Sequence, residues 1–134
     1  MGGAASTPSP RSIAAALAFA SQAVHLWVLT GQLVAAMPPG LFFFLVAVGE
    51  GLLGASLSFG GGRWTARLGV LLNVLVVLVW LLTRAVSIPQ LLEPVRLPVE
   101  GLGVLATAAE VALIFVLVRL ERSLSREKRR RRAL

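Results

Sequence analysis

Apolar residues run along most of the chain in four long segments, at about residues 13–36, 41–59, 66–88 and 99–120. A helix needs roughly 20 apolar residues to cross the roughly 30 Å hydrocarbon core of a bilayer. Because lipid offers no hydrogen-bond partner to a bare peptide group, we expect all four segments to be transmembrane helices. The predicted fold class is all-α, a polytopic four-transmembrane-helix bundle over residues 13–120.

Three breaks separate these segments, and each has the composition of a loop. MPPG (37–40) separates the first pair, GGGR (60–63) the second, and IPQLLEPVRLP (88–98) the third. Proline lacks the amide hydrogen that continues a helix, and glycine loosens the backbone. Outside the spans, we expect residues 1–12 to form a disordered polar arm and residues 121–134 a basic cytoplasmic tail.

The composition agrees with a membrane protein and excludes several kinds of chemistry. Hydrophobic residues make up 57% of the chain and charged residues 14%, against about half and a quarter in soluble domains. The chain has no cysteine, which excludes disulfides, thiol catalysis and iron–sulfur clusters. It has no P-loop, HExxH or GxSxG motif. We therefore expect neither an enzyme nor a bound cofactor, and leave open whether a metal binds.

The basic residues indicate the orientation of the helices. Residues 119–134 hold eight basic and two acidic residues, which is +6 of the total charge of +7. Arg11 precedes the first span, and Arg63 and Arg67 lie between the second and third. By the positive-inside rule both termini are cytoplasmic, in a multi-pass protein of the inner (plasma) membrane. The A-x-A sequence at 18–20 is a candidate signal-peptidase site, but the apolar run continues past it, so its cleavage stays open.

Three ionisable residues lie near the centres of three different spans: His25, Glu50 and Glu110. A charge at the bilayer centre costs about 2.5–3.5 kcal/mol on insertion scales, so these side chains should face the bundle interior. Two glutamates there could share a proton, pair with a protonated histidine, or hold a cation. Alternatively, neutral side chains only join the helices by hydrogen bonds. Further polar residues predicted to line this interior are Gln22, Asn73 and Thr107.

Small residues recur beside Glu50 at the spacing of one helix turn, in Ala47, Gly51 and Ala55. Such a ladder lets a second helix approach closely. It predicts a tight helix seam at Glu50, and it favours a homodimer, or a place in a larger membrane complex.

Two sets of charged residues lie toward the ends of the spans. We expect Arg84 to act as a clamp at the outer end, either by reaching the headgroups or by pairing with Glu93 or Glu100. The tail should adhere to anionic lipid at about 1 kcal/mol per basic residue. No aromatic residues alternate with the basic ones, so we do not expect nucleic acid binding. The predicted lipid-binding residues are Arg126, Lys128, Arg129, Arg130, Arg131 and Arg132.

Several segments resemble a group of small, uncharacterised four-span bacterial membrane proteins. The resemblance rests on His25 and on FFFLVA (42–47), WLLTRAVSIP (80–89), EPVRLP (93–98) and LATAAEVALI (105–114). That group has a more polar first hairpin loop, often with a further histidine, where this chain has TGQLVAAMPPG (30–40). The resemblance implies four spans and no mechanism.

Two functional hypotheses follow. In the first, the protein is a small proton- or cation-handling permease in which Glu50 and Glu110 are alternating acceptors and His25 is their partner. In the second, it is a structural or accessory subunit of a membrane complex whose basic tail binds anionic lipid or a cytoplasmic partner.

Overall fold

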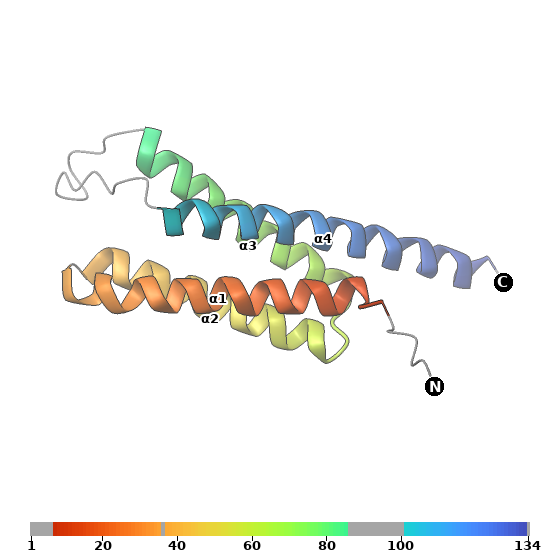
Figure 1. The fold of residues 1–134 in the computed structure, drawn as a ribbon. Helices are drawn as coiled ribbons and strands as arrows, with labels where there is room; N and C mark the ends of the chain where they lie inside the picture. The colour runs from red at the N-terminus through yellow and green to blue at the C-terminus, as the bar shows by residue number, and fades with distance from the viewer. Residues whose placement is uncertain (1–6, 36, 86–100, 134) are drawn as a thin grey trace.

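The computed structural model describes residues 7–35, 37–85 and 101–133, and these residues form four helices (Figure 1). The helices are α1 (Pro10–Ala35), α2 (Met37–Ser58), α3 (Arg63–Ala85) and α4 (Gly101–Arg132). The predicted all-α class is confirmed. Each helix is long and apolar enough to cross a membrane. The architecture therefore indicates a multi-pass membrane protein.

The outward surface of the bundle is apolar, as it is in proteins that face lipid. Large hydrophobic side chains stay exposed along every helix, for example Leu52 at 65%, Leu71 at 65% and Phe115 at 67%. Soluble monomers rarely expose contiguous apolar patches of such extent.

The helices form a ring in which α1 packs along α2 and α4, and α3 packs along α4, while α2 and α3 touch least. The start of α1 and the end of α4 lie at the same end of the bundle (Figure 1). We call this the terminal end. The half of the bundle interior nearest the terminal end is an apolar core. It is formed by Ala14, Ala15, Ala18, Leu53, Leu57, Ala66, Leu113, Leu117 and Leu120.

Three helices begin earlier than the sequence predicts, at Pro10, Met37 and Arg63. Ser9 caps α1, because its Oγ accepts a hydrogen bond from the Ser12 amide at 3.1 Å, so residues 10–12 are helical rather than part of the arm. The helix α2 begins at Met37, so the prolines of MPPG lie in its first turn. Amides there have no partner within the helix in any case, and proline therefore costs little.

The turn between α2 and α3 is a glycine cap. Gly60 has a positive φ of 92°, which an L side chain rarely adopts. Its amide donates to the Leu57 carbonyl, and the Gly61 amide donates to the Ser56 carbonyl at 2.7 Å. These two bonds form a Schellman motif, which ends α2 at Ser58.

The basic tail is not separate from the fourth span. The helix α4 continues without a break to Arg132 and extends past the other helices (Figure 1). Its 32 residues correspond to roughly 48 Å at 1.5 Å per residue, more than the bilayer core requires. The tail residues are therefore held at fixed positions along one helix.

The small-residue ladder of α2 is occupied within the monomer. Ala47 is fully buried. The Gln22 side chain of α1 packs directly onto Gly51, and the Phe19 ring packs onto Gly54. The predicted tight seam at Glu50 is thus the α1–α2 contact at Gly51, while Ala55, the third ladder residue, is half-buried.

Candidate functional site

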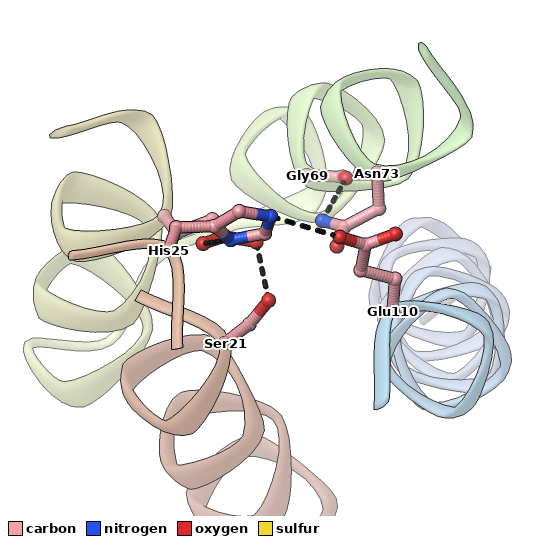
Figure 2. Close-up of polar contacts among 6 residues, drawn as sticks. Ser21, His25, Gly69, Asn73 and Glu110 are labelled. Carbon is pink, nitrogen blue, oxygen red and sulfur yellow. Dashed lines mark hydrogen bonds and ion pairs between the residues drawn. The ribbon is translucent and has the colours of Figure 1, made fainter. Parts of the chain in front are cut away.

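The structure brings together, from three helices, the three ionisable residues that lie near the centres of the predicted spans. His25 of α1, Glu50 of α2 and Glu110 of α4 are 4%, 0% and 1% exposed, respectively. Ser21, one turn before His25 on the same face of α1, is also buried. We refer to Ser21, His25, Glu50 and Glu110 as the His/Glu cluster (Figure 2).

The imidazole of His25 bridges the two carboxylates. Its Nδ1 lies 2.8 Å from Glu50 Oε2, and its Nε2 lies 3.3 Å from Glu110 Oε1. The Ser21 hydroxyl donates to the other oxygen of Glu50 at 2.6 Å. Phe43 of α2 stacks against the imidazole at 5.9 Å between ring centroids, which helps to orient the ring. The ring is therefore held by a partner on each nitrogen and by an aromatic face.

Glu110 is less completely paired than Glu50. Its Oε2 is buried and has no hydrogen-bond partner among the described residues. Asn73 of α3, which lies beside Glu110 in Figure 2, donates from Nδ2 to the Gly69 carbonyl at 2.8 Å. The Oδ1 of Asn73 is also buried and unpartnered within the described part of the chain. The α3–α4 side of the cluster thus presents two acceptors that an added proton or cation would satisfy.

The proton count of the cluster explains why it can accept a further positive charge. Two ionised glutamates and a protonated His25 sum to −1, and so do one ionised glutamate, one neutral glutamate and a neutral His25. One additional proton, or one monovalent cation, makes the cluster neutral. Neutrality is strongly favoured in a buried site, because an uncompensated charge there loses its hydration without replacement.

A metal ion is a second possible occupant. The ligand atoms of His25, Glu50 and Glu110 lie within 4.8 Å of one another. The separation of 3.3 Å between His25 Nε2 and Glu110 Oε1 fits two neighbouring ligands on a tetrahedral zinc, at about 2.0–2.1 Å from the metal. However, Nδ1 is already bonded to Glu50, so that carboxylate would orient the histidine instead of binding the ion. Only two of the three groups then remain as ligands, one fewer than catalytic zinc sites have.

Two residues predicted as polar lining lie outside the cluster. Gln22 is half-buried against Gly51 of α2, and the Thr107 hydroxyl donates to the carbonyl of Gly103 on its own helix at 2.9 Å. Of the three predicted lining residues, the structure brings only Asn73 to the cluster.

The predicted outer clamp is described only in part. Arg84 turns back onto its own helix, where it donates to the Trp80 carbonyl at 3.3 Å and lies over the Trp80 ring at 4.3 Å. Glu93 and Glu100 fall outside the described residues. The predicted lipid-binding residues of the tail, Arg126 and residues 128–132, are all exposed.

The site residues predicted from the sequence did not include Ser21, a member of the His/Glu cluster, or Phe43, which stacks on His25. The signal for Ser21 was present, because a residue four positions before His25 shares its helix face. Nothing in the sequence distinguishes Phe43 from the neighbouring phenylalanines at 42 and 44.

No protein-family model, curated protein or solved structure matches this chain.

Proposed function

We propose that this protein moves protons across the membrane, with His25 relaying them between Glu110 and Glu50. The observation that carries this proposal is the bridge itself: each ring nitrogen of one buried histidine faces a different buried carboxylate. Chains of Asp, Glu and His inside membrane helices are typical of proton relays. Histidine suits the central position because its two nitrogens exchange donor and acceptor roles.

The proposed relay transfers two protons through the imidazole of His25 in one concerted step. A proton on Glu110 is donated to Nε2 while the proton on Nδ1 passes to Glu50. The ring has then exchanged tautomers, and Glu110 is ionised while Glu50 is neutral. Glu50 then releases its proton to one side of the membrane, and Glu110 takes up another from the opposite side. The ring returns to its first tautomer when Nε2 loses its proton to water and Nδ1 gains one from water, which completes a cycle.

Two features favour transport of protons over a purely structural role. A cluster that served only to join helices would be expected to satisfy all its atoms, whereas Glu110 Oε2 and Asn73 Oδ1 are left without partners among the described residues. In addition, buried ionic groups contribute less to stability than apolar residues of similar volume, so a purely structural role would be served better by apolar side chains.

Proton flux into proteoliposomes under an imposed pH gradient tests the proposal. The wild type should dissipate the gradient, and Glu50→Gln and Glu110→Gln should each lower the rate at least tenfold, because an amide cannot accept and release the proton. Glu127→Gln is the matched control: it makes the same change at an exposed position of α4 and should leave the rate within about twofold.

The remaining outcomes identify the alternatives. A flux that depends on a particular cation would show that this cation, and not the proton, is transported. A stoichiometric metal in elemental analysis would likewise show that the cluster binds that metal. A silent wild type with no metal would overturn transport and leave the structural or accessory subunit as the supported function.

We further propose that the terminal end faces the cytoplasm of a plasma membrane, as the positive-inside rule predicts. The chain contains no cysteine, so single-cysteine variants can be labelled on intact cells with a membrane-impermeant maleimide. Pro38→Cys and Leu92→Cys should react, and Gly62→Cys and Arg130→Cys should be protected. The opposite labelling pattern would invert the proposed topology.

A further inference from the structure

At the terminal end, basic residues from two helices line one hollow. Arg63 and Arg67 from α3, and Lys128, Arg129 and Arg132 from α4, surround it together with Ser125. The volume is about 450 Å³, which is in the range of small-molecule sites. The hollow exists because α4 continues as a helix past the end of the span and places its basic residues opposite the start of α3.

The charge of this hollow is only partly compensated within the chain. Its lining carries five positive charges, and Glu121 compensates one of them, since it pairs with Arg67 at 2.9 Å and accepts from Ser125 at 3.3 Å. Five positive charges less one negative leave +4 around one cavity. The other acidic residue nearby, Glu127, pairs with Arg131, which does not line the hollow. The site is built for an anion with more than one acceptor oxygen, such as a phosphate.

Apolar surface continues from the hollow along the same face of α3. Leu71, Val74 and Leu78 follow Arg67 at i+4, i+7 and i+11, and they are 65%, 37% and 50% exposed. A ligand that places its phosphate between the arginines would therefore extend along an exposed apolar stripe. Trp64, next to the lining residue Arg63, is 71% exposed, and the Cζ of Arg67 lies 5.6 Å from the centroid of its ring. Exposed tryptophans are typical of the membrane interface.

From this arrangement we propose that the hollow binds the headgroup phosphate of one anionic phospholipid, whose acyl chains lie along Leu71, Val74 and Leu78. The site differs from general adhesion of the tail to an anionic surface, because Arg63 and Arg67 take part and Arg126, Arg130 and Arg131 do not. It is also independent of the His/Glu cluster.

Native mass spectrometry of the protein in neutral detergent, titrated with phosphatidylglycerol, tests this site. The wild type should bind one molecule in preference to phosphatidylcholine. The double variant Arg63→Gln/Arg67→Gln should weaken that binding at least tenfold. The matched control Arg126→Gln/Arg130→Gln removes the same charge from the same end of the bundle, outside the hollow, and should change it less than threefold. Equal losses in both pairs would show general charge attraction and overturn the site.

Two further measurements separate lipid binding from a folding defect and distinguish a lipid phosphate from a soluble one. Because Arg67 pairs with Glu121, Lys128→Gln/Arg132→Gln tests the α4 side of the hollow without disturbing that pair. This variant should also bind phosphatidylglycerol at least tenfold more weakly, and unchanged binding would contradict the proposal. Inorganic phosphate at millimolar concentration should not displace the lipid. Displacement would assign the hollow to a soluble anion instead.

Discussion

The substitution His25→Leu is expected to destabilise the bundle by about 3–5 kcal/mol, the cost of removing one partner from a buried ionic group. Without the imidazole, Glu110 loses its only hydrogen-bond partner among the described residues, and Glu50 keeps only the Ser21 hydroxyl. In detergent this loss should lower the thermal midpoint by roughly 10 °C or more, measured by retention of the monodisperse peak after heating.

The triple variant His25→Leu/Glu50→Leu/Glu110→Leu separates stability from function. It removes every charged group of the cluster and fills the space with apolar side chains of similar volume, a change that is often neutral or stabilising for buried ion clusters. The Ser21 hydroxyl can then bond to a carbonyl of its own helix. We expect a midpoint near that of the wild type, with no proton flux. A triple variant as unstable as His25→Leu would show that the cluster is needed for folding and would favour the structural-subunit hypothesis.

The helices and the depth of the ionisable residues could be predicted from the sequence, because both depend on counting along the chain. Four apolar runs predict four spans, and residues near their centres must meet at the midplane if the helices are antiparallel. His25, Glu50 and Glu110 meet in this way. Close packing at Gly51 was similarly predictable, and the helix that packs there is α1.

Features that depend on rotation about the helix axes could not be predicted. Gln22 follows Ser21 by one residue, which turns it about 100° away from the cluster and onto Gly51. Thr107 lies one turn from Glu110, but its hydroxyl bonds to its own backbone, as threonine hydroxyls often do in helices. The basic hollow was also hidden, because it requires α4 to stay helical well beyond the apolar run.

The second large effect is expected at Gly69, where α3 passes between side chains of α2 and α4. A Cβ atom there would lie 2.7 Å from Leu53 Cδ1 and 2.9 Å from Leu117 Cδ1, closer than real Cβ contacts occur. The larger side chain in Gly69→Leu would push α3 away from both neighbours. Overpacking of this kind costs about 1–3 kcal/mol and sometimes more. Gly69 is also buried and supplies the carbonyl that accepts from Asn73.

We therefore expect Gly69→Leu to lower the thermal midpoint and to impair proton flux together, because the displaced helix carries Asn73 away from Glu110. Gly62→Leu is the matched control, since nothing lies within 4 Å of a Cβ at that position. Relief of the clash should be specific: Gly69→Ala/Leu53→Ala should lose less stability than the sum of its two single changes. Strictly additive losses would mean that α2 and α3 separate freely at this point, and would contradict the tight contact between Gly69 and Leu53.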